Sequence, residues 1–123
     1  MLKKVALHKV EEWTYSAYVV AGDFIYTAHI GGVRDEQGNK LDTIEEQTKQ
    51  SLENLKAILE QEGVTLNDVV KTTVYLKNID DFKSMRDIYR DYFSDGYPAR
   101  MTATTEFIED DCLIQVVAVA YKS

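Results

Sequence analysis

The last apolar stretch of the chain places the strongest constraint on its fold. Residues 112–121, CLIQVVAVAY, do not alternate apolar with polar side chains. In a strand, alternate residues point to opposite faces of the sheet. One face would carry Leu113, Val117 and Val119, and the other Ile114, Val116, Ala118 and Ala120. Since both faces are apolar, the sheet that contains this strand needs cover on both sides.

The rest of the chain alternates between strand-like and helix-like periods. Strands are expected near 3–8, 15–22, 24–30, 68–78, 100–107 and 112–121, and helices at about 43–62 and 81–93. The expected order is β-β-β-α-β-α-β-β. Such an order predicts an α+β fold, with one β-sheet and two helices packed on one of its faces.

Local signals indicate where these elements turn and end. AGD at 21–23 predicts a tight hairpin turn. For the first helix we expect a capping box between Asp42 and Glu45, with Gly63 just beyond its end. Asp80 or Asp81 is expected to cap the second helix. The strand at 68–78 is expected to place the following side chains on one face: Val70, Thr72, Val74 and Leu76.

Two helices can cover only one face of such a sheet. The chain has 123 residues, which predicts a single domain (1–123) and leaves no further domain to cover the second face. We therefore expect a homo-oligomer in which the open sheet faces pack together. The alternative is a monomer whose second face is covered at its edges.

The charge and the apolar pattern bear on the kind of partner. The net charge is −7, from 14 basic and 21 acidic residues, and the basic residues are scattered among carboxylates. An acidic chain without a basic patch is not expected to bind nucleic acid. Apolar runs are too short for a membrane span, and the N-terminus lacks a signal-peptide pattern. A single cysteine, Cys112, fits the expected cytoplasmic location.

The only proline, Pro98, lies two residues before Arg100. Proline fixes its own φ and disfavours helix in the residue before it, so the second helix must end by Tyr97. An arginine that follows a stiff connection has a defined direction, and its planar guanidinium matches a carboxylate. Arg100 is therefore a candidate anchor for a substrate carboxylate. The alternative is a surface arginine paired with one of the many acidic residues.

Three segments together resemble a known family. They are DVVKTTVYLKNIDDFKSMRDIYRDYF at 68–93, YPAR at 97–100 and LIQVVAVA at 113–120. They resemble the RidA family, also called the YjgF family, and the likeness extends over nearly the whole chain. It implies an α+β fold like that of chorismate mutase, with one mixed β-sheet. It also implies a homotrimer whose sheets pack into a central barrel, with ligand pockets between subunits.

The resemblance also implies an activity. Active members of this family hydrolyse reactive 2-imino acids, or their enamine tautomers, to 2-keto acids and ammonia. Arg100 matches the arginine that binds the substrate carboxylate, and Tyr15 matches a pocket tyrosine. No cofactor is expected, because attack of water on an imine requires orientation and proton transfer. No metal site is expected either, since His8, His29 and Cys112 are too dispersed.

Other expected pocket residues depart from the active pattern. Ala28, Arg86 and Thr102 stand where the family has serine, asparagine and cysteine. Gln115 replaces a glutamate; an amide can orient water but cannot act as a base near neutral pH. His29 could supply the missing base, because imidazole titrates near physiological pH. The alternative is a strand-end histidine with no role in catalysis.

The resemblance and its departures together leave three candidate functions. The first is an imine deaminase with weakened or altered activity. The second is a non-catalytic trimer that binds small carboxylates such as 2-keto acids and acts as a regulator. The third is the endoribonuclease or translation-inhibitor role of some relatives, which the acidic charge disfavours. Cys112 is interpreted as a structural residue rather than a nucleophile, because no basic residue is adjacent to it in the sequence.

Overall fold

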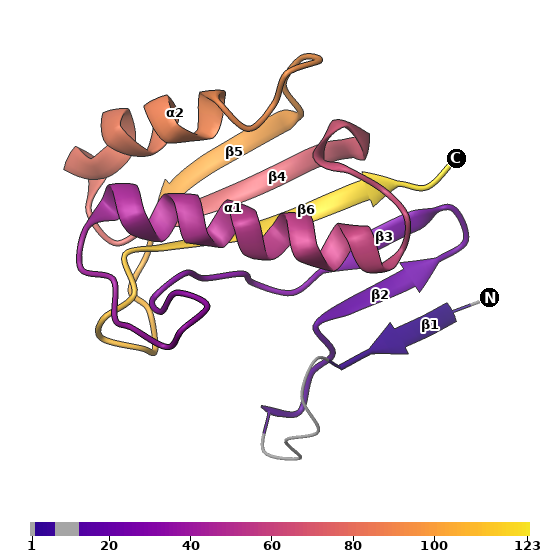
Figure 1. The fold of residues 1–123 in the computed structure, drawn as a ribbon, viewed down its shortest axis with the longest axis horizontal. Coiled ribbons are helices and arrows are strands. Elements are labelled where there is room, and N and C mark those ends of the chain that lie inside the picture. The colour runs from indigo at the N-terminus through magenta and orange to yellow at the C-terminus, as the bar shows by residue number, and fades with distance from the viewer. Residues whose placement is uncertain (1, 7–12) are drawn as a thin grey trace.

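The structure is a computed structural model that describes residues 2–6 and 13–123 (Figure 1). Two 3₁₀ turns, η2 (Leu66–Asp68) and η3 (Ile79–Asp81), precede β4 and α2. The main elements are β1 (Leu2–Val5), β2 (Tyr18–Ala21), β3 (Phe24–Thr27), α1 (Ile44–Gln61), β4 (Val69–Leu76), α2 (Phe82–Arg90), β5 (Ala99–Thr104) and β6 (Ile114–Tyr121). This is the predicted β-β-β-α-β-α-β-β order.

The six strands form one mixed sheet in the order β1-β2-β3-β6-β4-β5. Strands β4 and β5 run parallel, and the other neighbours are antiparallel. Both helices lie on the same side of the sheet (Figure 1). The predicted α+β fold with two helices on one face is confirmed.

The N-terminal strands agree with the sequence where the structure describes them. Strand β2 ends at Ala21 and β3 begins at Phe24, so Gly22 and Asp23 form the predicted tight turn. Gly22 has φ +59°, a conformation that favours glycine. Strand β1 ends at Val5, whereas we expected it to extend to residue 8. Residues 7 and 8, and thus His8, lie outside the described residues.

The N-cap of helix α1 lies one residue later than predicted. Thr43, not Asp42, is the N-cap: its hydroxyl accepts a hydrogen bond from the Glu46 amide at 3.1 Å. Glu46 in turn accepts from the Thr43 amide at 3.4 Å. The predicted Asp42–Glu45 box is therefore wrong, because the same spacing recurs one residue on with a threonine. At the other end Gly63, with φ +74°, follows the C-cap as predicted.

Helix α2 is shorter than predicted and lacks the predicted cap. It spans 82–90 rather than 81–93, and its N-cap Asp81 makes no side-chain capping bond. Beyond the helix, the amides of Asp91 and Tyr92 donate to carbonyls three residues earlier. This tighter winding lets Phe93 reach the core although it lies outside the helix.

An irregularity at the start of β4 changes which residues face the core. Val69 pairs with Ala120 and Lys71 with the next residue, Val119, so Val70 has no partner in β6. Val69 is buried and Val70 is 44% exposed. The predicted core face was therefore wrong at Val70. The rest of that face was predicted correctly, since these residues are buried: Thr72, Val74 and Leu76.

Strand β6 is apolar on both faces, as the sequence indicated. Its helix-facing side is fully buried and consists of Ile114, Val116, Ala118 and Ala120. On the opposite face of the sheet, Val117 and Val119 are only half-buried. Several large side chains on that face are 38–61% exposed: Phe24, Tyr26, Met101 and Tyr121. We call this side the open face; one chain by itself leaves it uncovered.

A buried carboxylate ties both ends of the chain to α1. Glu62 is 8% exposed and accepts a hydrogen bond from the Tyr18 hydroxyl at 2.7 Å. Lys3 lies 2.7 Å and Lys122 3.5 Å from its oxygens. Hydrogen bonds from Lys3 and Tyr18 hold the pKa of Glu62 below its ordinary value of 4.5. This cluster joins β1 and β2 to the end of the first helix.

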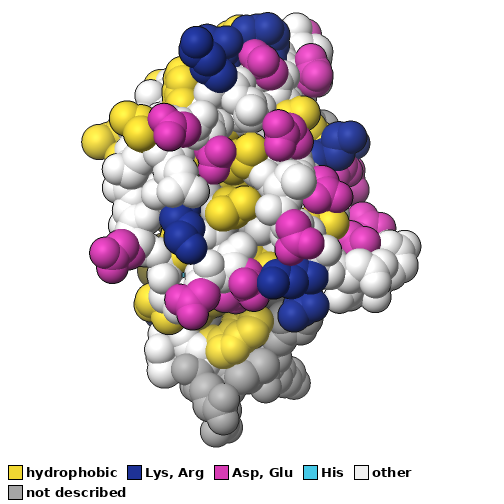
Figure 2. All heavy atoms as spheres, turned by 90° about the vertical axis from the view of Figure 1, so that its left-hand side faces the viewer, with side chains coloured by type: hydrophobic (Ala, Val, Ile, Leu, Met, Phe, Trp, Pro, Cys, Tyr) yellow, Lys and Arg dark blue, Asp and Glu magenta, His cyan; other side chains and the backbone are white. Residues whose placement is uncertain are grey.

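Charged side chains of both signs are interspersed on one side of the molecule. Figure 2 shows acidic side chains spread over one side of the molecule, with basic side chains between them rather than in one stripe. Within the described residues, no helix is long and apolar enough to cross a bilayer.

Candidate functional site

Four of the predicted site residues line one pocket of about 550 Å³. They are Tyr15, Ala28, His29 and Gln115. The pocket lies between the segments around residues 13–17 and 28–34, the C-terminal half of α1 and the start of β6. We call it the Tyr15 pocket.

Aromatic rings form one wall of this pocket. Tyr15 stacks on Trp13 with ring centroids 5.9 Å apart and planes 7° apart. His29 lies on the Tyr15 ring, 5.2 Å between centroids. Thr14, between the stacked residues, has φ +46°, a left-handed conformation that is rare for a β-branched residue. Such strain often marks a functional segment, and here it lies where two rings are brought onto one wall.

The segment that follows His29 in the pocket lining lies in close contact with α1. The Asn54 side chain donates to the Gly31 carbonyl at 2.9 Å. A Cβ atom on Gly32 would lie 2.5 Å from the Gln47 carbonyl oxygen and 2.7 Å from the Ser51 amide nitrogen. Only glycine fits that position, so segment 30–33 lies directly on the helix.

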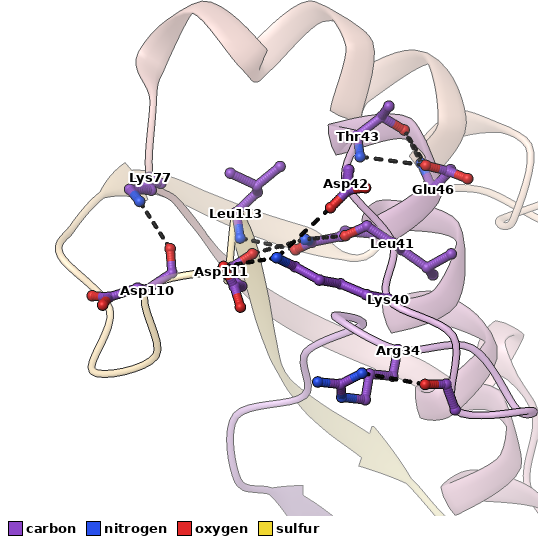
Figure 3. Close-up of polar contacts among 12 residues, drawn as sticks. Arg34, Lys40, Leu41, Asp42, Thr43, Glu46, Lys77, Asp110, Asp111 and Leu113 are labelled. Carbon is purple, nitrogen blue, oxygen red and sulfur yellow. Dashed lines mark hydrogen bonds and ion pairs between the residues drawn. The ribbon is translucent and has the colours of Figure 1, made fainter.

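The buried side chain of Gln47 joins two loops beside this segment. Its amide nitrogen donates to the carbonyls of Leu41 and Asp111, each at 2.9 Å, and its oxygen accepts from the Leu113 amide at 2.8 Å. In Figure 3, Lys40 reaches from the first loop to Asp111 of the second, a contact of 3.1 Å. These bonds fix the residues that lead into β6 and thus to Gln115.

Cys112 lines the Tyr15 pocket but is buried, with 2% of its surface exposed. Burial raises the pKa of the Cys112 thiol, and the thiol donates a hydrogen bond to the Ile114 carbonyl at 3.2 Å, which is possible only while it is protonated. A protonated thiol is a poor nucleophile. The structure therefore agrees with the interpretation of Cys112 as a structural residue.

Arg100 lies in a second pocket, of about 330 Å³, at the start of β5. We call it the Arg100 pocket; it is lined by Arg86, Tyr89, Arg90, Tyr97, Pro98 and Arg100. Among the described residues, no acidic side chain forms an ion pair with the Arg100 guanidinium. Arg100 is exposed, as the alternative of a surface arginine expects, but the acidic partner that this alternative includes is not present in the described part of the chain.

Aromatic rings of α2 position the Arg100 side chain. Its Cζ atom lies 4.9 Å from the centre of the Tyr89 ring and 5.7 Å from that of Phe82. Such cation–π contacts restrict the guanidinium without neutralising it. The Tyr89 hydroxyl is itself hydrogen-bonded to the Thr72 hydroxyl at 2.8 Å, and burial raises the pKa of Tyr89. The planar fork of Arg100 is thus held in place and free to bind an anion.

The predicted site residues do not come together within one chain. The Tyr15 pocket and the Arg100 pocket share no lining residue. Arg86 lines the Arg100 pocket together with Arg100. Thr102, which lies on β5 and pairs with Val74 of β4, lines neither pocket. No cluster of potential metal ligands is present among residues 2–6 and 13–123.

Arg90 and Trp13 are among the pocket-lining residues that sequence reasoning missed. Arg90 is four residues after Arg86, a spacing that places both on one side of a helix, so the sequence carried a usable signal. Trp13 stacks on Tyr15 through an unusual backbone at Thr14, which the sequence does not indicate.

Comparison with known proteins places the chain among close relatives. A RutC family protein of Pyrococcus abyssi is 44% identical over 109 residues, which cover 88% of this chain and 86% of that protein. The 2-iminobutanoate/2-iminopropanoate deaminase of Salmonella typhimurium is 32% identical, over 88% of this chain and 87% of the enzyme. The crystal structure of Escherichia coli TdcF with bound serine superposes with a TM-score of 0.86 at 26% identity, covering 98% of this chain and all of that one.

A family model agrees with these relatives. The model described as endoribonuclease L-PSP matches residues 7–122, nearly the full length. The chain therefore belongs to the endoribonuclease L-PSP family, which is the RidA (YjgF) family that its motifs resemble.

Proposed function

We propose that this protein is a homotrimer that hydrolyses reactive 2-imino acids to 2-keto acids and ammonia, with activity weakened by Gln115. The observation that carries the proposal is Arg100. Its guanidinium is held by two aromatic rings, lines a pocket and has no acidic partner among the described residues. Such a group is suited to bind a small carboxylate through two parallel hydrogen bonds.

Assembly would bring the two halves of the site together. Arg100 and the Tyr15 pocket lie apart within one chain. The open face presents exposed aromatic and aliphatic side chains, including Tyr26 and Met101, over a strand that is apolar on both sides. Association through such a face removes apolar surface from water. In the proposed trimer, Arg100 of one copy faces the Tyr15 pocket of a neighbouring copy.

The proposed hydrolysis requires only an anchor for the carboxylate, an oriented water molecule and a path for protons. Arg100 would hold the carboxylate of the imine, and the Gln115 amide oxygen would orient a water molecule toward C2. The water oxygen bonds to C2 while one of its protons passes to the imine nitrogen through the His29 imidazole, which gives a carbinolamine. The remaining hydroxyl proton then passes to nitrogen as the C2–O double bond forms and the C–N bond breaks, which releases ammonia and the 2-keto acid. Because an amide cannot accept that proton near neutral pH, the reaction depends on His29 or on solvent.

The relatives support this choice of substrate. One relative at 32% identity is named a 2-iminobutanoate/2-iminopropanoate deaminase. A structural relative holds serine, an amino acid of the same size class. The acidic surface, by contrast, speaks against a ribonuclease role despite the name of the family model.

A second candidate function follows from Gln115. If the amide abolishes catalysis, the same pocket would bind 2-keto acids without converting them, and the protein would act as a sensor or regulator. The two functions are best distinguished by substitution of Gln115, because the same pocket geometry serves both.

The experiment generates 2-iminobutyrate in place with an amino-acid oxidase and follows its capture by semicarbazide. We expect the protein to lower semicarbazone formation. Arg100→Gln should remove the effect, whereas Lys83→Gln, an equal charge change at an exposed position of α2, should not. Gln115→Glu should increase the rate by about tenfold or more, since general base catalysis contributes 10²–10⁴-fold in full.

No effect of the wild-type protein, together with 2-keto acid binding that Arg100→Gln abolishes, would support the binding protein instead. Equal behaviour of Arg100→Gln and Lys83→Gln would refute the role of Arg100 in either function. Sedimentation of the purified protein as a monomer would refute the shared site.

A further inference from the structure

The Arg100 pocket concentrates positive charge in an acidic protein. Three of its six lining residues are arginines, and the other three are Tyr89, Tyr97 and Pro98, so no carboxylate lines it. The chain as a whole carries a net charge of −7. A single carboxylate needs one guanidinium, and Arg100 already supplies it. The other two arginines therefore call for a separate explanation.

Arg86 and Arg100 approach the same space from different elements. Arg86 lies on α2 and Arg100 on β5, and their Cζ atoms lie 6.0 Å and 5.7 Å from the centre of one ring, Phe82. Arg90, one helical turn beyond Arg86, lines the same pocket. The three arginines thus line a common hollow of about 330 Å³. That volume is at the lower end of the range for small-molecule sites.

The protein itself only partly neutralises this charge. Arg86 and Arg90 share one carboxylate, Asp87, at 3.4 Å and 3.8 Å. The Asp87 side chain is 59% exposed, and such surface pairs contribute little. In addition, the Nε atom of Arg86 is buried and has no hydrogen-bond partner. A buried donor without a partner is unfavourable, and a bound acceptor would relieve it.

We propose that Arg86, supported by Arg90, binds a second acidic group of the ligand. The ligand would then be a dicarboxylate, a 2-imino or 2-keto acid whose side chain ends in a carboxylate. This inference rests on the proposed function only in that Arg100 takes the first carboxylate. Arg86 would then determine specificity: it favours a charged side chain over an apolar one of equal length.

The test compares two five-carbon ligands that differ in their far end, 2-oxoglutarate and 2-oxovalerate. Their affinities for the full-length protein are measured by isothermal titration calorimetry. We expect 2-oxoglutarate to bind about 10- to 100-fold more tightly, as one charge-assisted contact allows. Arg86→Gln should remove most of this preference and leave 2-oxovalerate binding unchanged. Lys83→Gln on the same helix should preserve the preference, and thermal melting confirms that each variant is folded.

The outcomes separate this inference from the proposed function. If Arg86→Gln leaves the preference intact, or if the wild-type protein shows none, the second acidic site is wrong. In either case, if Arg100→Gln no longer binds 2-oxoglutarate or 2-oxovalerate, the role of Arg100 as the carboxylate anchor is still supported. If Arg100→Gln changes neither affinity, the proposed function fails, and this inference fails with it.

Discussion

Two neighbouring glycines in the wall of the Tyr15 pocket offer a stringent test of the structure. A Cβ atom on Gly32 would lie 2.5 Å from the Gln47 carbonyl oxygen and 2.7 Å from the Ser51 amide nitrogen. Both are backbone atoms of α1, so they can move only if the helix or the segment moves. A Cβ atom on Gly31 would meet nothing closer than 3.8 Å, an ordinary contact.

The size of the effect follows from these contacts. Overpacking a core costs about 1–3 kcal/mol and more where the neighbours cannot yield. Because Gly32 meets two fixed backbone atoms, we expect Gly32→Ala to lower the free energy of unfolding by about 3 kcal/mol or more. Gly31→Ala should change it by less than about 1 kcal/mol, and it gains a little from the stiffer unfolded chain.

Urea denaturation followed by circular dichroism, at one fixed protein concentration, measures the difference. With a slope of about 1–3 kcal/mol per molar urea, Gly32→Ala should lower the midpoint by about 1–3 M. The proposed imine hydrolysis should also fall in the folded fraction of Gly32→Ala, since the pocket wall moves. If the two variants unfold at the same midpoint, segment 30–33 does not lie on α1 as described.

Two further predictions concern buried ionisable groups. Glu62→Gln should destabilise the protein at pH 7 by about 1–2 kcal/mol, since it removes a charged acceptor of Lys3 and Tyr18. The effect is kept to this size because Lys3 is half exposed, and water weakens its ion pair with Glu62. Because the pKa of Glu62 is lowered by folding, its contribution is complete above about pH 4.5 and is lost as the pH falls through the lowered value. Urea midpoints of the variant and wild type should therefore converge as the pH falls below the lowered pKa of Glu62; a constant gap would contradict this account. Cys112 should react with iodoacetamide at pH 7.5 at least about tenfold more slowly in the native protein than in urea, because burial keeps the thiol protonated; equal rates would contradict its burial.

Much of the fold could be predicted because hydrophobic periodicity survives in each element. The buried residues of α1 follow the helical period, and β6 is apolar on both faces as its sequence indicated. The errors lie where backbone geometry interrupts that period. At Val70 the extra residue in β4 reverses the expected face, and at Thr43 the cap is chosen between two equivalent patterns.

The site was less accessible to sequence reasoning because it depends on contacts between distant segments. Tyr15, His29 and Gln115 share one pocket, yet only the resemblance to a family grouped them beforehand. Spacing along α2 could have joined Arg90 to Arg86, since helix geometry alone relates them. The separation of Arg100 from Tyr15 within one chain has no signal in periodicity or spacing; only the resemblance to a family with pockets between subunits implied it.

The direction of Arg100 depends on the core as much as on Pro98. Thr72 on β4 lies beside Arg100 in the parallel pair, and its hydroxyl is bonded to that of Tyr89 on α2. The Tyr89 ring in turn lies under the guanidinium, 4.9 Å from ring centre to Cζ. A substitution at the fully buried Thr72 would therefore shift the Tyr89 ring and leave the backbone at Pro98 unchanged. Ligand affinity at Arg100 should consequently respond to packing between β4 and α2, even when every residue that touches the ligand is unchanged.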